Sequence, residues 1–265
     1  MRGAFQILLV ISALYILLCL LAYVFQEKLL FFPEKLDADY KFKFDGDFTE
    51  VSIPVEEDVN LHGLHFRSVN SKGVIFYLHG NAGSLASWGS VGETYGDFGY
   101  DTFILDYRGY GKSDGRITSE DQLFSDVQIA YDYVKRLYNE EEIIVLGYSV
   151  GTGPASKIAT SNNPKLLILQ APFYSLVDMM KNLFPIFPEF LLKYRFENNK
   201  YIPDCTMPIV IFHGKNDEVI PYEQSLKLKP LLKPSDTLIT LEGEGHNGMT
   251  YTHAYLDALR EILGD

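Results

Sequence analysis

Several loops of this chain carry residue types suited to nucleophilic catalysis, and each follows a short apolar run. Ser149 lies in the turn Gly147-Tyr148-Ser149-Val150-Gly151, directly after the apolar run Ile143–Leu146 and before a helix-like stretch. A tight strand-to-helix turn lifts a serine hydroxyl above a sheet, and flanking glycines remove side chains that would clash. The N-terminal dipole of the following helix favours negative charge at the same place. Ser149 is therefore the candidate nucleophile.

A serine nucleophile needs a general base, and the base needs a carboxylate that orients it. Asp217 lies in the loop after the apolar run 209–212, and His246 lies in a glycine-rich loop after the last apolar run, 238–241. Where the nucleophilic serine lies in such a strand-to-helix turn, the three groups follow along the chain in the order Ser, Asp, His. We therefore expect Asp217 to orient His246, and His246 to take the proton of Ser149.

Other histidines and acids are poorer candidates for these roles. Two histidines belong to an early hairpin, one to a helix, and two are expected to fix their own loops by hydrogen bonds: His62 and His65, His253, and His79 and His213. The competing acids are Asp106, Glu218, Glu242 and Glu244. Asp106 also ends an apolar run, but it precedes Ser149, which is the wrong chain order.

A loop of small residues follows an earlier apolar run, in the segment YLHGNAGS from Tyr77 to Ser84. Such a loop can present a backbone N–H to a carbonyl oxygen and, with the N–H of Val150, form an oxyanion hole of two donors. Asn81 is the favoured second donor, with Ala82 as the alternative. The plainer interpretation is a turn before a helix capped near Ser84, and it is compatible with the first.

The remaining pattern predicts the elements that position these loops. Alternation in Thr49–Val55, and more briefly at Leu64 and Phe66, predicts two half-exposed strands in a hairpin. Six almost continuously apolar runs predict strands buried on both faces: 74–78, 102–105, 143–146, 166–169, 209–212 and 238–241. Three- and four-residue apolar spacing predicts helices over 120–137 and 251–263. This order predicts a mostly parallel, doubly wound α/β sheet, with ligands beyond the carboxyl ends of its strands.

Six segments in register with these strands resemble the α/β-hydrolase superfamily, specifically its small-lid, membrane-anchored esterase and thioesterase-like branch: YLHGNAGS, LDYRGYGKSDG, LGYSVGTGPA, QAPF, FHGKNDEVIP and GEGHN. The resemblance extends from about residue 70 to the C-terminus. It implies the α/β-hydrolase fold, an N-terminal hairpin, a short helical lid, and hydrolysis of an ester or thioester. It also implies that residues 106–113 form a structural loop bordering the site. The physiological substrate does not follow from it.

The N-terminal segment predicts a membrane anchor. No charged residue occurs between Arg2 and Glu27, and the 22 apolar-rich residues of Ala4–Phe25 are long enough to cross the hydrocarbon core of a bilayer. A cleaved signal peptide would have a shorter apolar core and a small-residue cleavage site, and buried core helices are rarely so long and uncharged. Basic residues on both flanks leave the side of the membrane open. We expect an anchor over 1–26, a juxtamembrane segment over 27–45 and a catalytic domain over 46–265.

Residues 173–205 form an insertion that follows the strand after the nucleophile, so we expect it to overhang the site as a lid. It is rich in Leu, Met and Phe and is broken by Pro185 and Pro188. One interpretation is a plain helix packed on the sheet. The other is an apolar pocket for an acyl chain, with Phe187 and Phe190 among the substrate-binding walls. The second interpretation predicts that kcat/KM rises as the acyl chain lengthens from two carbons.

Composition limits the partners. The net charge of −12, from 23 Lys and Arg against 35 Asp and Glu, argues against nucleic acid. The chemistry requires no cofactor or metal, and no His and Cys cluster has ligand spacing. We therefore expect a membrane-anchored serine hydrolase acting on a small or lipid-like acyl substrate. A peptidase of the same fold and a non-catalytic binding protein on that fold are the alternatives.

Overall fold

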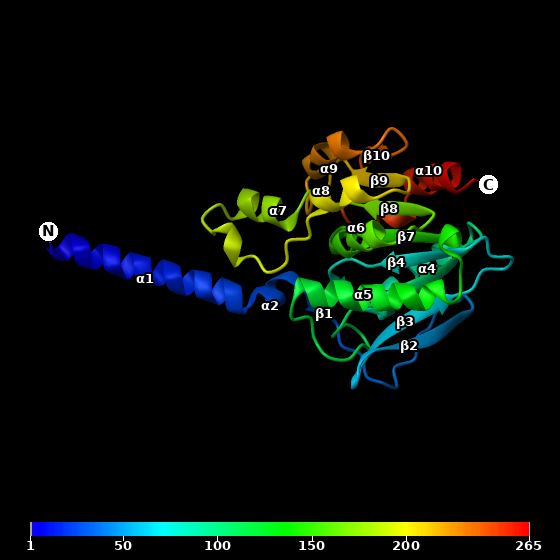
Figure 1. Ribbon diagram of the computed structural model, residues 1–265, viewed down its shortest axis with the longest axis horizontal. Coiled ribbons are helices and arrows are strands. Elements are labelled where there is room, and N and C mark those ends of the chain that lie inside the picture. Colours follow the sequence, from blue (N-terminus) through cyan, green and yellow to red (C-terminus); the bar gives the residue numbers. More distant parts are fainter. Residues whose placement is uncertain (1, 265) are drawn as a thin grey trace.

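The computed structural model describes residues 2–264, which form a long N-terminal helix projecting from an α/β domain (Figure 1). One sheet crosses the domain in the order β10-β9-β8-β7-β4-β6-β3-β2. Its strands are β2 (Phe48–Glu56), β3 (Val59–Phe66), β4 (Val74–Leu78), β6 (Asp101–Asp106), β7 (Ile143–Tyr148), β8 (Leu166–Gln170), β9 (Ile209–Gly214) and β10 (Thr237–Leu241). The strands from β10 to β6 are parallel, whereas β3 is antiparallel to both β6 and β2. The expected fold class, with its antiparallel N-terminal hairpin, is confirmed.

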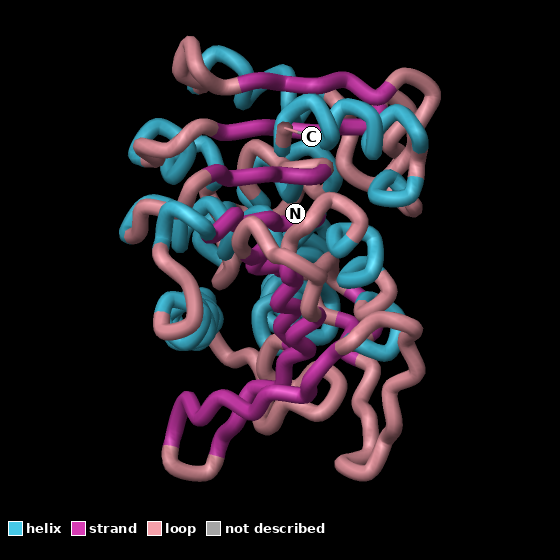
Figure 2. Tube along the Cα trace, turned by 90° about the vertical axis from the view of Figure 1, so that its right-hand side faces the viewer, coloured by secondary structure: helices cyan, strands magenta, loops and turns pink. Residues whose placement is uncertain are grey.

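The continuously apolar strands lie in the centre of this sheet, as their sequences predict. Every residue of β4, β6, β7, β8 and β9 is buried. Helices cover both faces of the sheet (Figure 2), so alternate side chains of one strand enter different clusters. One cluster packs beneath α5 (Glu120–Lys135) and α6 (Thr152–Ser161). The other packs beneath α3 (Leu85–Trp88), α4 (Val91–Gly96) and α10 (His253–Leu263).

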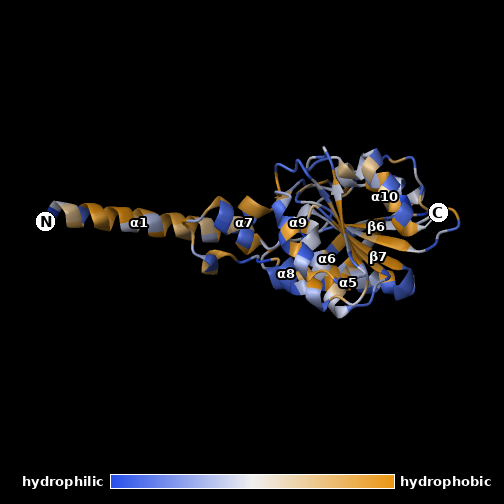
Figure 3. Cartoon of the chain, turned by 90° about the horizontal axis from the view of Figure 1, so that it is seen from above, coloured by the Kyte–Doolittle hydropathy of each residue, from blue (hydrophilic) through white to orange (hydrophobic). Residues whose placement is uncertain are grey.

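The N-terminal helix α1 (Arg2–Val24) has no buried residue and is long and apolar enough to cross a membrane. Figure 3 shows it as an apolar rod outside the domain, whose own apolar residues are concentrated in the central strands.

The segment after α1 packs against the domain. Helix α2 (Gln26–Leu30) follows α1, and the ring of Phe31 then lies edge-on to that of Tyr194 at 5.0 Å. The short strand β1 (Phe32–Pro33) pairs in parallel with β5 (Ala82–Gly83). The residues expected to link anchor and domain therefore contact the loop that carries Asn81.

The insertion lies at the end of the domain from which α1 projects (Figure 1). It contains α7 (Leu176–Leu183), a 3-10 turn (Glu189–Leu191), α8 (Asn198–Tyr201) and a second 3-10 turn (Ile202–Asp204). The second half of the insertion packs into the core through Tyr194, Phe196 and Ile202. Further elements are α9 (Glu223–Leu228) and 3-10 turns at 140–142, 149–151, 229–231 and 249–251.

The hairpin contains a buried histidine that makes stability depend on pH. His65 on β3 is 1% exposed, and its Nε2 lies 2.9 Å from the hydroxyl oxygen of Tyr138. Burial, and then the charge of Arg67, lower the pKa of His65 to about 4 against the opposing charge of Asp101, whereas an unfolded histidine titrates near 6.5. Between these values the unfolded chain binds more protons. Folding stability is therefore lost as pH falls from about 6.5 to about 4, by up to about 3 kcal/mol.

Replacing His65 by glutamine is expected to shrink this loss, because an amide can still bind Tyr138 but does not titrate. The measurement is the free energy of unfolding in urea, for the full chain in detergent, at pH 7 and near pH 4. A variant that loses as much stability on acidification as the wild type would assign the effect to other groups.

Candidate active site

Ser149 lies in a strained turn between β7 and α6. Its φ is +53°, a left-handed value that is unusual for serine. A Cβ on Gly147 would lie 2.5 Å from the carbonyl oxygen of Gly151, and a Cβ on Gly151 would lie 2.1 Å from that of Leu78. Both flanking residues must therefore be glycine for the turn to close against β4 as it does.

The side chains of Ser149, His246 and Asp217 form one hydrogen-bonded chain. Nε2 of His246 lies 3.1 Å from Oγ of Ser149, and Nδ1 of His246 lies 2.7 Å from Oδ2 of Asp217. All three residues are buried, with exposures of 6–8%. In the neutral tautomer with the proton on Nδ1, this imidazole can accept the proton of Ser149 while it donates to Asp217.

Asp217 is held as a carboxylate. Its Oδ1 accepts the backbone N–H groups of Val219 and Ile220 at 2.9 and 2.7 Å. Burial acts to raise the pKa of Asp217, but hydrogen bonds from His213, His246 and the Ile220 N–H together hold that pKa well below its ordinary value. A charged carboxylate at this place can stabilise a positive charge on the imidazole of His246.

Two residues outside the expected set hold these groups in place. Nε2 of His213 lies 3.3 Å from Oδ2 of Asp217 and 2.8 Å from the carbonyl oxygen of Ile220. His213 therefore fixes its loop, as expected, and also contacts the carboxylate of Asp217. The short separation of four residues between His213 and Asp217 could have indicated this contact. The hydroxyl of Tyr148 donates to the carbonyl oxygen of His246. Nothing in the sequence pattern points to that contact between residues almost 100 positions apart.

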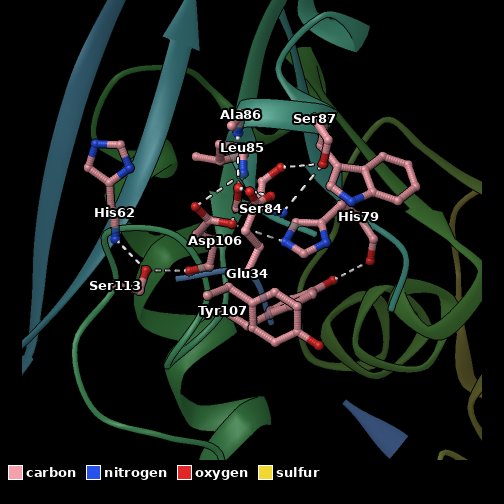
Figure 4. Close-up of polar contacts among 12 residues, drawn as sticks. Glu34, His62, His79, Ser84, Leu85, Ala86, Ser87, Asp106, Tyr107 and Ser113 are labelled. Atoms are coloured by element: carbon pink, nitrogen blue, oxygen red, sulfur yellow. Dashed lines mark hydrogen bonds and ion pairs between the residues drawn. The ribbon is translucent and has the colours of Figure 1, made fainter. Parts of the chain in front are cut away.

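A second buried network holds the loop after β4 (Figure 4). Oδ1 of Asp106 accepts the N–H of Leu85 at 3.1 Å and lies 3.5 Å from Nε2 of His79. Ser113 donates to the carbonyl oxygen of Asp106 at 2.7 Å, and Ser84 caps α3 as expected. The carboxylate of Asp106 thus stabilises the loop that carries Asn81. The carboxylate that binds His246 is that of Asp217.

The loop after β4 begins close to the turn that carries Ser149. Gly151 approaches the carbonyl oxygens of Leu78 and His79, so Val150 lies next to the loop. Nδ1 of His79 lies 2.7 Å from the carbonyl oxygen of Gly80. Because the N–H and C=O of a trans peptide point in opposite directions, this contact turns the N–H of Asn81 away from His79. The donor roles of Asn81 and Val150 remain predictions.

The two phenylalanines expected to line a substrate pocket lie near the middle of the insertion. Phe187 packs against Phe184 with ring centroids 6.4 Å apart, and the side chain of Phe190 is 79% exposed. Both lie at or before the first 3-10 turn of the insertion, outside the hydrogen-bonded group around Ser149. Their contact with substrate remains a prediction. Within residues 2–264, no cluster of three or more His, Cys, Asp or Glu is arranged to hold a metal, and both cysteines are free thiols.

Comparison with known proteins identifies the family. A family model described as serine aminopeptidase, S33, matches residues 69–202. The alpha/beta hydrolase domain-containing protein 17B of Homo sapiens is 31% identical over 199 residues, covering 74% of this chain and 68% of that protein. The lysophosphatidylserine lipase ABHD12 of Macaca fascicularis is 28% identical over 227 residues, covering 74% of this chain and 56% of that protein.

Among solved structures, the esterase Pf2001 of Pyrococcus furiosus superposes with a TM-score of 0.69 at 19% identity, covering 88% of this chain and 97% of that one. At this identity the likeness concerns the fold. The family model and the relative at 31% identity show the family: this chain belongs to the α/β-hydrolase superfamily.

Proposed function

We propose that this protein is a serine hydrolase that cleaves carboxylic ester or thioester bonds of lipid-like acyl substrates at a membrane. The observation that carries the proposal is the hydrogen-bonded chain from Asp217 through His246 to Ser149, with the serine in a strained turn at the end of a buried strand. That arrangement activates a hydroxyl that is otherwise a weak nucleophile at neutral pH.

The proposed reaction has two steps. His246 takes the proton of Ser149 as its oxygen attacks the acyl carbonyl, and Asp217 stabilises the imidazolium. The backbone N–H groups of Val150 and Asn81 hold the oxyanion. His246 then protonates the leaving alcohol or thiol. Water, deprotonated by the same histidine, releases the acyl group and restores the serine.

An acyl substrate is favoured over a peptide by the surroundings of the site. The relative ABHD12 is named as a lipase, and the insertion exposes Leu183, Phe184 and Ile186 at the end of the domain from which α1 projects. The family model is named for an aminopeptidase. A peptidase of that kind would bind the free amino group of its substrate with an acidic group beside Ser149. The carboxylate of Asp217 is already hydrogen-bonded to His246 and does not serve as that group. We therefore retain the peptidase as the alternative.

We further propose that α1 anchors the protein in a membrane as a spanning helix, with the side of the membrane undecided. The helix has 23 residues and none of them is buried. Exposed apolar surface of this extent is unfavourable in water, and at about 1.5 Å per residue the helix matches the roughly 30 Å hydrocarbon core of a bilayer.

The test is a panel of p-nitrophenyl esters, acyl thioesters and aminoacyl amides presented to the full chain in detergent micelles. We expect ester and thioester hydrolysis, with kcat/KM rising from acetyl to medium acyl chains by up to about fourfold per methylene, because each buried methylene contributes up to about 0.8 kcal/mol.

Three outcomes would contradict parts of this proposal. Cleavage of aminoacyl amides alone would favour the peptidase. Acetyl esters outrunning all longer esters would remove the acyl pocket and return the insertion to a packing role. Turnover of none of the panel would favour the non-catalytic alternative.

A further inference from the structure

We infer that the insertion tip, defined as residues 183–190, is itself embedded in the bilayer that α1 spans, so that the active-site end of the domain rests on lipid. The inference rests on the proposed anchor and deepens it by assigning a second membrane-inserted element. Its occupant is the acyl region of a phospholipid bilayer.

The insertion tip has the surface of a membrane-inserted loop. Leu183, Phe184, Ile186 and Phe190 are 60%, 55%, 61% and 79% exposed. The one charged residue of the tip, Glu189, is paired with Lys181 at 2.7 Å. Large apolar side chains gathered in this way on a monomer mark a binding surface, and one without unpaired charge suits hydrocarbon.

Direct contact with α1 identifies lipid as the partner of this surface. The hydroxyl of Tyr15, in the second half of α1, donates to the carbonyl oxygen of Ile186 at 2.6 Å. A backbone carbonyl in hydrocarbon needs such a donor because no water can satisfy it. The tip therefore lies alongside the helix, and any bilayer around α1 at that level also surrounds the tip.

Hydrogen bonds join residues 191–193 of the insertion to the start of α2, and they fix the position of the tip beside α1. Buried Gln26 donates to the carbonyl oxygen of Leu191 at 2.9 Å and accepts the N–H of Lys193 at 2.7 Å. Nζ of Lys193 pairs with Glu27 at 3.0 Å and lies 4.6 Å from the ring centroid of Tyr23. Polar contacts of this kind are typical of the interface, so they place the edge of the hydrocarbon core near the end of α1.

The helical rise then gives the depth of the tip. Tyr15 precedes Phe25 by ten residues, which is about 15 Å along a helix. That is about half of a hydrocarbon core of roughly 30 Å. The tip residue that Tyr15 contacts, Ile186, therefore lies well below the lipid headgroups.

Positive charge at the foot of α1 agrees with this depth. A cavity of about 740 Å³ is lined by Val24 at the end of α1 together with Glu27, Lys28, Arg108, Arg116 and Lys193. Arg108 is buried and paired with Asp126, and Lys193 is paired with Glu27. The other two basic side chains, Lys28 and Arg116, lie where the lipid phosphates would be if the tip were immersed.

The consequence concerns substrate access. The carboxyl ends of the parallel strands, where Ser149 lies, face the same end of the domain as α1 and α7 (Figure 1). With the insertion tip in the bilayer, an acyl chain can reach this end from lipid without being exposed to water, which avoids the unfavourable transfer of apolar surface into water.

The test measures the depth of the tip directly. In a Cys19→Ala background, Ile186→Cys is labelled with the environment-sensitive dye NBD, and the full chain is reconstituted in phosphatidylcholine vesicles that contain doxyl-labelled lipids. Val69→Cys is the matched control, because Val69 is 88% exposed and precedes β4, at the opposite end of the sheet. Cys205 is buried and is left unchanged.

We expect doxyl groups on the acyl chains to quench the label at 186 by at least about half, because the acyl chains fill the hydrocarbon core, and to leave the label at 69 unchanged. Aqueous iodide should show the reverse. A label at 186 that iodide quenches as strongly as the label at 69 overturns the inference. A carbonate wash of the same vesicles separates the two proposals: release of the chain refutes the anchor, whereas retention with an unquenched tip refutes the inference alone.

Discussion

Replacing Ser149 by alanine is expected to abolish labelling by a fluorophosphonate and to lower kcat/KM for ester hydrolysis by about 10⁴-fold or more. The reason is chemical: alanine has no oxygen to form the acyl-enzyme, and the hydrogen bond to Nε2 of His246 disappears with it. The fold should be preserved, because the hydroxyl is removed without adding atoms.

Two further variants divide the roles of the neighbouring groups. His246→Ala should cost at least as much in kcat/KM as Asp217→Asn, because the base transfers the proton whereas the acid orients and stabilises the imidazole. For Asp217→Asn we expect a loss of about 10³- to 10⁴-fold, since an amide can present its N–H to Nδ1 and favour the wrong tautomer.

The measurement combines gel-based probe labelling with steady-state rates on the best ester of the panel. Ser161→Ala is the matched control, because Ser161 is an exposed serine at the end of α6, and it should label and turn over like the wild type. Full activity in Ser149→Ala would falsify the assignment of the nucleophile and transfer the chemistry to another group.

The parts of the site that could be predicted from sequence are those in which the neighbouring residues along the chain determine the position of each side chain. A serine between glycines, at the end of a buried strand, is confined to a tight turn by sterics, and the left-handed φ of Ser149 follows from that. Asp217 and His246 also lie in loops that follow strands of the sheet. Because parallel strands end at one edge of the sheet, their side chains could be expected to meet.

The parts that could not be predicted depend on contacts between distant segments. Pairing of β1 with β5 joins residues 50 positions apart, and the bond from Tyr15 to Ile186 joins residues 171 positions apart. Neither leaves a periodic pattern, because a single hydrogen bond to a backbone carbonyl places no demand on the residue that supplies it. The same apolar segment, 183–190, reads equally as a pocket wall or as exposed surface until its neighbours are known.

Adding one methyl group at the turn is expected to lower both the stability and the activity of the protein. In Gly151→Ala the new Cβ would lie 2.1 Å from the carbonyl oxygen of Leu78 and 2.7 Å from that of His79. Both are backbone atoms of a buried strand end, so no flexible side chain can yield. We expect a loss of about 3 kcal/mol or more in the free energy of unfolding.

Activity should fall with stability even if the variant folds. Relief of the clash requires the turn to withdraw from β4, which moves Ser149 away from His246 and Val150 away from Asn81. A displacement of about 1 Å in such a site costs about 100-fold in rate. The two effects separate when kcat/KM is measured in the folded fraction, well below the denaturation midpoint.

Gly96→Ala is the matched control for this substitution. Gly96 ends α4, and a Cβ there meets no atom within 4 Å. Alanine at such a helical position should leave activity unchanged and raise stability by about 0.5–1 kcal/mol. The measurement is denaturant unfolding of both variants in detergent, followed by the ester assay. A Gly151→Ala protein as stable and active as Gly96→Ala would mean that the turn around Ser149 does not pack against the end of β4. The proposal that Val150 and Asn81 bind one oxyanion would then lose its structural basis.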